Sequence, residues 1–351
     1  MDRILIVVKS SFQLVSAVLI RQMYLECECT LLLDGELEFL RNMGSTKSIN
    51  EAFDKVSYFR EGVKKNNKIA RCIDYFLNRN NDKLGSEDDD TLLKEKFDRI
   101  FYFSFTPNIS TIFGNIQKKY PDTIFCKTED GLASYVLAES EIDKNKKVFK
   151  NKIFHMFLEQ PEKEELYLLF PELYVGEDCY NLRKVIISEN AKHIFKDACD
   201  EILKEKCELN KYLVFEECFD QVSDEEAYIK VLQSVVEVLG KDSVSVKPHP
   251  RNTKRVVDGP SMNMGIPWEF FCLAYGDELK GKKLFSLIST TCYMPHLLGV
   301  EDVETYYLYP CYKGTIAARE SKKFNEFMNK LNEKCPYIHV VSDLNDINKL
   351  F

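Results

Sequence analysis

Short apolar runs alternate with segments of helical periodicity along most of the chain, and this alternation restricts the fold more than any other feature. In the first half, the apolar runs predict strands at residues 4–8, 30–33, 56–59, 100–103 and 123–126. Helical spacing predicts helices at residues 12–23, 68–77 and 109–119. Strands that alternate with helices of this length form βαβ units, in which the strands pair in parallel. The sequence therefore predicts an α/β fold with a mostly parallel sheet.

A second series of the same kind follows a charged, lysine-rich stretch. It predicts strands at residues 185–187, 212–215, 244–246, 284–288, 305–308 and 339–341, and helices at 190–206, 224–239 and 322–334. A chain of 351 residues also exceeds the size at which a single core usually stops growing. We predict two Rossmann-like domains, residues 1–176 and 177–351, with parallel sheets that face each other across a cleft. Ligands of such sheets bind beyond the carboxyl ends of the strands.

Composition excludes several classes of function. The net charge is −8 and no basic stripe is present, which argues against a nucleic-acid-binding surface. No apolar run is long enough for a membrane-spanning helix, and the N-terminus lacks the basic region of a signal peptide. The 12 cysteines include no CxxC pair, and Cys27 and Cys29 have no partners that would complete a zinc site. We expect a cytoplasmic protein with free thiols and no metal.

In the first half, polar side chains follow two predicted strands. Ser10, Ser11 and Gln13 come directly after the first strand, at the start of a helix whose free N–H groups attract anions. A serine there can equally cap the helix. The chain has no GxGxxG or GxxxxGK[ST] motif, so nicotinamide-dependent and P-loop enzymes lose their main support.

Two adjacent acids and a glycine, Glu129, Asp130 and Gly131, follow the strand predicted at 123–126. Crowded carboxylates can have one pKa raised, which suits a general base. A turn with acids that cap the next helix would give the same pattern. Asp220, after another predicted strand, is a rival candidate for the base.

In the second half, His249 lies between two prolines at the end of a predicted strand. Proline restricts its own backbone and that of the residue before it, so the imidazole leaves the strand in a nearly fixed direction. Lys247 and Arg251 flank the motif, and Pro250 completes it. This arrangement suits contact with an anionic leaving group, although a proline-rich surface turn is the alternative.

Two further segments complete the candidate site. Trp268, the single tryptophan, stands next to Glu269, a pair that could cover a base and bind the hydroxyls of a ribose. A core position is the alternative for the tryptophan. Ser289, Thr290 and Thr291 end an apolar strand before a helix, where hydroxyls and helix N–H groups can bind an anion without a metal.

Together these motifs resemble the bacterial sialyltransferases, and among them glycosyltransferase family 52. The resemblance is carried by Glu129-Asp130-Gly131, His249-Pro250 and Ser289-Thr290-Thr291, in this order and spacing, and by two supporting segments, 9–13 and 265–269. It covers most of the chain.

The resemblance implies a GT-B fold, an inverting reaction without a metal or other cofactor, and CMP-sialic acid as the donor substrate. Glu129 or Asp130 would deprotonate the acceptor hydroxyl, and His249 would protonate or hydrogen-bond the departing phosphate. Ser289 and Thr290 would share the phosphate charge, and Glu269 would hold the ribose. Lys247 and Arg251 are our own additions, as cations for the phosphate or the sialic acid carboxylate.

The resemblance also suggests a galactose-terminated surface glycan, such as lipooligosaccharide or capsule, as acceptor, a homodimer, and at most peripheral contact with the membrane. Three alternatives stay open. They are a polysialyltransferase, a transferase of another activated sugar or polyol phosphate, and a nucleotide-binding protein without catalytic activity.

Overall fold

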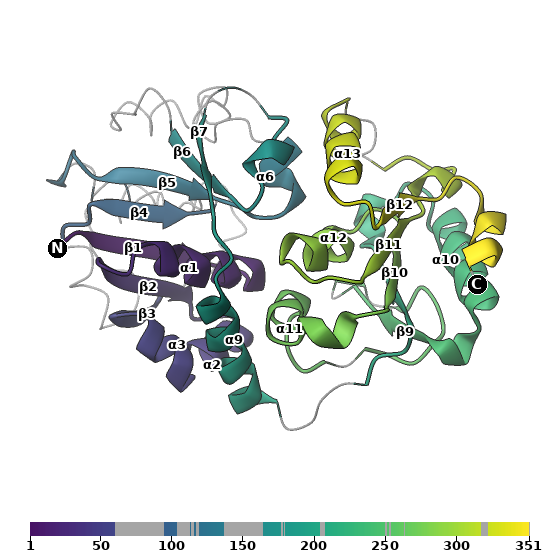
Figure 1. Ribbon diagram of the computed structural model, residues 1–351, viewed down its shortest axis with the longest axis horizontal. Helices are drawn as coiled ribbons and strands as arrows, with labels where there is room; N and C mark the ends of the chain where they lie inside the picture. Colours follow the sequence, from purple (N-terminus) through teal and green to yellow (C-terminus); the bar gives the residue numbers. More distant parts are fainter. Residues whose placement is uncertain are drawn as a thin grey trace, which may run out of the picture. The chain divides into compact units, whose positions relative to one another are not determined.

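Two compact α/β units make up the chain (Figure 1). The computed structural model describes residues 1–59, 95–103, 113, 116, 119–136, 164–176, 178, 180–203, 208–249, 251–252, 254–262, 264–316 and 322–350. The N-terminal unit comprises Met1–Glu172 and Gly176–Ile202, and the C-terminal unit comprises Leu173–Val175 and Leu203–Phe351. The main division therefore lies after residue 202 rather than at the predicted boundary after residue 176.

The later division follows from the packing of helix α9 (Glu189–Ile202). Its apolar face buries Phe195, Ala198 and Cys199. This face contacts helices of the N-terminal unit: α1 (Ser11–Met23), α2 (Glu38–Gly44) and α3 (Lys47–Ala52). Because α9 buries its apolar face against the N-terminal unit, it belongs to that unit. The second series of strands and helices in the sequence was predicted to begin before this helix.

The N-terminal unit is built on a seven-stranded sheet in the order β3-β2-β1-β4-β5-β6-β7, with every pair parallel. The strand order reverses at the β1/β4 pair, as in a Rossmann fold. The strands are β1 (Arg3–Val8), β2 (Glu28–Asp34), β3 (Lys55–Phe59), β4 (Arg99–Tyr102), β5 (Ile124–Thr128), β6 (Glu164–Leu168) and β7 (Tyr180–Lys184). One further helix, α6 (Leu132–Val136), follows β5.

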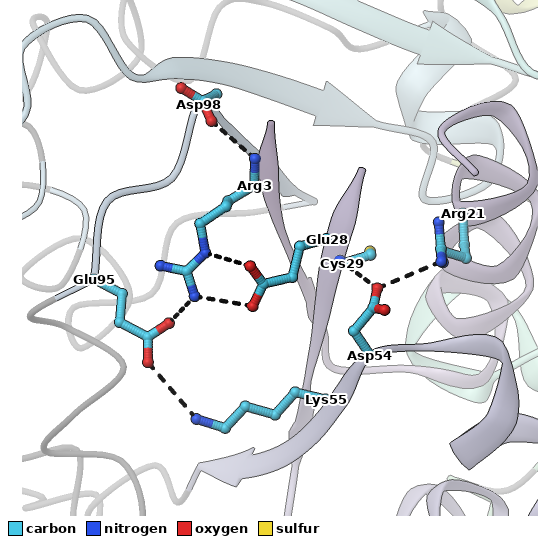
Figure 2. Close-up of polar contacts among 8 residues, drawn as sticks. All are labelled: Arg3, Arg21, Glu28, Cys29, Asp54, Lys55, Glu95 and Asp98. Carbon is cyan, nitrogen blue, oxygen red and sulfur yellow. Dashed lines mark hydrogen bonds and ion pairs between the residues drawn. The ribbon is translucent and has the colours of Figure 1, made fainter. Parts of the chain in front are cut away.

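Ion pairs join the starting ends of the strands in this sheet (Figure 2). The guanidinium of Arg3 donates two hydrogen bonds to Glu28, of 2.9 and 3.2 Å, and also pairs with Glu95. The backbone N–H of Arg3 donates to Asp98 at 2.8 Å, and Lys55 lies 3.9 Å from Glu95. A two-pronged guanidinium–carboxylate pair fixes orientation as well as distance. The network therefore aligns β1 with β2 and with the residues that precede β4.

The C-terminal unit is built on a five-stranded parallel sheet in the order β12-β11-β10-β8-β9. Its strands are β8 (Tyr212–Phe215), β9 (Val244–Lys247), β10 (Lys283–Ser286), β11 (Glu304–Tyr307) and β12 (Ile338–Val340). Because β9 lies on one side of β8 and the later strands lie on the other, the order reverses between β8 and β10. In open parallel sheets, this reversal point is where ligands bind, at the carboxyl ends of the strands.

The helices of the C-terminal unit are α10 (Glu225–Leu239), α11 (Trp268–Ala274), α12 (Thr290–Leu297) and α13 (Lys322–Lys334). The carboxylate of Asp224 caps α10 by accepting from the Ala227 N–H at 2.9 Å, and Gly240 ends this helix with a φ of 81°. Short 3₁₀ segments are η2 (Pro171–Leu173), η3 (Phe219–Gln221), η4 (Lys241–Ser243), η5 (Gly276–Leu279), η6 (Tyr309–Cys311) and η7 (Leu344–Leu350).

Most predicted elements are present, although the short helices α2, α3 and α11 were not predicted. Two further corrections concern one edge of the first sheet. The strand predicted at residues 185–187 is wrong, because β7 ends at Lys184, and β6 was not predicted. β7 is an edge strand with four exposed residues in succession, so it lacks the apolar signal of a buried strand. The helix predicted at 68–77 lies outside the described residues, as does most of the one at 109–119. No helix in the described part of the chain is long and apolar enough to cross a membrane.

Candidate functional site

Glu129 lies directly after β5 and is buried, with an exposed fraction of 1%. Its Oε2 accepts hydrogen bonds from the Tyr135 hydroxyl at 2.8 Å and from the Leu169 N–H at 2.9 Å. Its Oε1 is buried without a hydrogen-bond partner. Burial raises the pKa of Glu129 to about 7, since the two donors only partly offset the loss of hydration. The carboxyl group is thus oriented, close to half-ionised at neutral pH, and able to accept one more hydrogen bond.

Asp130, the next residue, is exposed and is hydrogen-bonded to Gln13, near the end of β1. Its Oδ1 accepts from the Gln13 amide at 3.2 Å, and its own N–H donates to the Ser134 hydroxyl at 2.7 Å. Partial desolvation of the carboxyl group raises the pKa of Asp130, while Gln13 and the charge of Lys127 oppose this. The two acids therefore have different surroundings although they are adjacent.

Gln13 connects the loop after β1 to the acid pair, so two segments that the sequence proposed separately lie in contact. Its Oε1 accepts from the Lys9 N–H at 2.6 Å, so both ends of the amide are held. Ser10 is the N-cap of α1 and Ser11 is the first residue of that helix. The capping role predicted for Ser10 or Ser11 thus falls to Ser10.

Gly131 completes this loop with a φ of 77°, in the left-handed region that other residues rarely adopt. Its carbonyl accepts from the Ser134 N–H at 3.0 Å, and α6 begins at the next residue. The glycine is therefore needed for the turn that joins the acids to α6.

In the C-terminal unit, His249 follows β9 and is half-buried. Its Nδ1 accepts a hydrogen bond from the Arg251 N–H at 3.2 Å. Since an accepting nitrogen carries no proton, the neutral ring has its proton on Nε2. Burial lowers the pKa of His249, as do the charges of Arg251 and Lys247. The imidazole is therefore a neutral hydrogen-bond donor near neutral pH, through Nε2–H.

Other candidates surround this histidine. Lys247 is the last residue of β9; burial lowers its pKa, and the charge of Glu269 on α11 partly opposes the shift. The charge of Asp220, in η3, only partly opposes the lowering of the His249 pKa. Asp220 thus belongs to the C-terminal unit, close enough to His249 for its charge to act on the imidazole. Pro250 lies outside the described residues.

The hydroxyl segment after β10 opens helix α12. Ser289 is the N-cap, and its hydroxyl donates to the Thr291 Oγ1 at 3.0 Å. The Ser289 N–H donates in turn to the Ser286 hydroxyl at 2.9 Å. Thr290 and Thr291 form the first turn of α12 and are half-buried. The segment therefore places hydroxyls and helix N–H groups beside the point where the strand order reverses.

Trp268 is a core residue, and the structure gives its ring no role over a nucleotide base. The ring is 2% exposed, stacks on Phe271 at 5.9 Å and meets Phe215 edge-on at 4.8 Å. Its indole N–H donates to the Thr291 carbonyl at 2.8 Å. Proline at 295 cannot donate to that carbonyl, which is four residues earlier in α12, so the indole takes the place of the missing helix hydrogen bond. Glu269, one residue later, is half-buried near Lys247.

Two acids in the segment before Asp220, which also offers rival acids for the base, have a larger part in this region. Glu216 and Glu217 follow β8 directly and are 3% and 4% exposed. Glu217 Oε1 accepts from the Ser286 hydroxyl and from the Ile288 N–H at 3.0 Å. Glu216 Oε1 accepts from the Val256 N–H at 2.8 Å and from the Val257 N–H at 3.3 Å. The sequence did contain a signal for this role, namely two acids directly after an apolar strand. Carboxylates that are buried at such a position need several hydrogen-bond donors from the segments around them.

A family model for alpha-2,8-polysialyltransferases matches residues 4–259, more than half of the chain. The chain belongs to the alpha-2,8-polysialyltransferase family. The matched region includes the acid pair and His249, and the segment Ser289–Thr291 lies beyond it. The match confirms the predicted resemblance to bacterial sialyltransferases. Among these it indicates the polysialyltransferases, which the sequence had left open as an alternative. It does not extend to glycosyltransferase family 52.

Comparison with curated protein sequences found no match. Among solved structures, UDP-GlcNAc 2-epimerase from Neisseria meningitidis is 13% identical, with a TM-score of 0.50, and the match covers 99% of this chain and 90% of that one. A protein described as a UDP-N-acetylglucosamine 2-epimerase from Listeria monocytogenes is 11% identical, with a TM-score of 0.50, at 99% and 86% coverage. The calicheamicin glycosyltransferase is 8% identical, with a TM-score of 0.49, at 99% and 88% coverage.

The two likenesses with a TM-score of 0.50 concern the fold alone. With its seven-stranded and five-stranded parallel sheets, the polysialyltransferase-family chain has the GT-B-type fold that the sequence predicted.

Proposed function

We propose that this protein transfers sialic acid from CMP-sialic acid to a hydroxyl group of a glycan that already ends in sialic acid. The observation that carries the proposal is the family match, because it spans both the acid pair and His249. The family description also favours a sialylated acceptor over the galactose-terminated one expected from the sequence. A galactose-terminated lipooligosaccharide or capsule glycan is the second candidate.

On the acceptor side, Glu129 is our candidate for the general base. A base needs a pKa near the working pH and a free lone pair that faces the proton it takes. Glu129 has a pKa of about 7 and a buried Oε1 without a donor, whereas Asp130 already accepts from Gln13. An acceptor hydroxyl would supply the donor that Oε1 lacks. Asp130 and Gln13 would then hold the loop in place.

On the donor side, the candidate groups are His249, Lys247, Arg251 and the start of α12. The Nε2–H of His249 would donate to the phosphate of CMP, and the two cations would balance its charge. Ser289, Thr290 and the helix N–H groups would bind further phosphate oxygens. Glu269 would accept from the ribose hydroxyls. This set supplies charge stabilisation from the chain itself, so we propose a metal-independent reaction.

The proposed step is a single displacement. The acceptor oxygen forms a bond to the anomeric carbon of the sialyl group while the bond from that carbon to the phosphate oxygen breaks. The acceptor proton passes to Glu129, and the electron pair of the broken bond leaves on the phosphate of CMP. Attack opposite to the leaving group inverts the anomeric configuration.

The test measures CMP release from CMP-sialic acid with two acceptors, one ending in lactose and one ending in sialic acid, with and without EDTA. We expect product with the sialylated acceptor, little change with EDTA, and a loss of about 10²–10³-fold in kcat for His249→Ala, the scale of one lost donor to a developing anion. His193→Ala, on the N-terminal unit's α9, is the matched control and should retain activity. Absence of both CMP release and sialylated product with either acceptor contradicts the proposal.

A further inference from the structure

Glu216 and Glu217 form a buried pair that the proposed chemistry does not use. They follow β8, whose sheet neighbours are β9 on one side and β10 on the other. The loops after β9 and β10 carry His249 and the hydroxyl segment Ser289–Thr291, respectively. The pair therefore stands between the two loops of the proposed donor site.

The carboxylate of Glu217 holds the loop after β10. Its Oε1 accepts from the Ser286 hydroxyl and the Ile288 N–H, and the Ser286 hydroxyl accepts from the Ser289 N–H at 2.9 Å. This chain of hydrogen bonds ends at the N-cap of α12. It fixes where the first turn of that helix presents its hydroxyls and N–H groups.

The main chain around Glu217 holds the loop after β9 through Asn252. The Asn252 amide donates to the Glu217 carbonyl at 2.9 Å and accepts from the Phe219 N–H at 3.1 Å. The Asn252 N–H donates to the His249 carbonyl at 3.0 Å. Glu216 adds a second attachment of the same loop, at the N–H groups of Val256 and Val257.

We propose that Glu217 is a positioning residue that holds the hydroxyl segment Ser289–Thr291 and, through Asn252, His249 in register with each other. This proposal rests on the proposed function in one respect only, namely that the hydroxyl segment and His249 bind the same phosphate. Glu217 itself touches neither substrate nor reacting atoms. Its contribution is to keep two separate loops at one fixed spacing.

The experiment compares Glu217→Gln with Glu217→Ala in the full chain. Glutamine keeps an oxygen that can accept from Ser286 and Ile288, while alanine removes it. We expect Glu217→Ala to lose about 10²-fold in kcat/KM for CMP-sialic acid, the scale of a displacement near 1 Å at a site. A neutral acceptor forms a weaker hydrogen bond than a charged one, so Glu217→Gln should stay within about tenfold of the wild type.

Asp224→Ala is the matched control for lost stability, because it removes a capping carboxylate from α10 in the same unit. We expect it to lower the melting temperature while kcat/KM stays unchanged. Equal losses in the Gln and Ala variants overturn the proposal, since they would mean that the charge of Glu217, not its position as an acceptor, matters.

Amide hydrogen exchange gives a second readout that needs no substrate. Glu217→Ala should raise the exchange rates of Ile288 and Ser289, and Glu217→Gln should restore their protection. Unchanged protection of both amides in the Ala variant overturns the proposal even if the enzyme is active. A wild-type chain that releases no CMP would contradict the proposed function, while the exchange result would still decide the role of Glu217.

Discussion

Adjacent carboxyl groups with different surroundings can divide two tasks between them. Glu129 is enclosed, with one oxygen held by two donors and the other without a partner. Asp130 is exposed and bound to the Gln13 amide. The sequence could not separate the two, because burial and hydrogen bonding decide the pKa of a carboxyl group and neither is visible in the dipeptide.

The pKa of Glu129 leads to a prediction for the pH dependence of the rate. Burial raises this pKa from its ordinary value of 4.5 to about 7, and a base acts only when ionised. We therefore expect kcat/KM to fall about tenfold for each pH unit below 7, and to level off above it. Rate measurements from pH 5 to 9 check this.

Two isosteric variants, Glu129→Gln and Asp130→Asn, identify which of the two acids is the base. Glu129→Gln should lose about 10²–10⁴-fold in kcat, the usual contribution of a general base, and should no longer show the limb near pH 7. Asp130→Asn keeps an oxygen that can accept from Gln13, and should retain most of the activity. The reverse result would assign the base to Asp130.

Helix α12 shows how a distant side chain can repair a helix that contains proline. Pro295 leaves the Thr291 carbonyl without its helix donor, and the indole of Trp268 supplies one at 2.8 Å. In Figure 1, α11, which begins with this tryptophan, lies beside α12 in the C-terminal unit. One hydrogen bond thus fastens α11 to the helix that carries Thr290 and Thr291.

A double-mutant cycle tests this repair. Trp268→Phe should lower the free energy of unfolding by about 1–3 kcal/mol beyond the loss of packing, because it leaves the carbonyl unsatisfied. Pro295→Ala restores a backbone N–H four residues after Thr291. In that background, the same tryptophan substitution should cost less, and urea unfolding of the four proteins measures the difference. Additive effects would show that the two residues do not share the carbonyl.

The elements that the sequence predicted well are those with a strong apolar pattern. The strand predicted at 244–246 and the helix predicted at 322–334 correspond to β9 and α13, because a buried strand and a one-sided helix each leave a regular spacing. The exposed edge strand β7 leaves none. Trp268 was open between core and ligand contact because its surroundings come from Phe215 and Phe271, of which only the second is near in sequence.

The sequence predicted which residues form the candidate site, but not the contacts that hold them in place. The sequence identified the acids, the histidine and the hydroxyl segment, since each follows a predicted strand. The supports were not predictable. Glu217, Asn252 and Ser286 act through contacts between residues 33 to 71 positions apart, which no local pattern reports.

At the scale of the whole molecule, each unit has its own sheet and its own buried core. Separate clusters of apolar side chains pack on the two sheets, one around Leu5, Ile100 and Tyr102 and the other around Val214, Leu232 and Phe285. Each unit therefore has the interior that an independently cooperative structure requires.

This division predicts a selective effect of CMP on stability. All proposed donor contacts lie in the C-terminal unit, so CMP should protect that unit in preference to the other. At a concentration of 100 times its Kd, a ligand adds about 2.7 kcal/mol to the stability of the structure that binds it. Hydrogen exchange with and without CMP should show slower exchange concentrated in residues 208–350. Equal protection of both units would contradict this assignment of the donor site.

The ion pairs around Arg3 have a practical consequence for protein engineering. Because the seven strands of that sheet are parallel, their starting ends gather at one edge, and the loop that carries Glu129 leaves from the other. A designer who wants a heat-resistant variant can therefore rework the charges among Arg3, Glu28 and Lys55. Such changes lie a full strand length from Glu129 and Asp130, so we expect them to raise thermal stability without lowering the proposed activity.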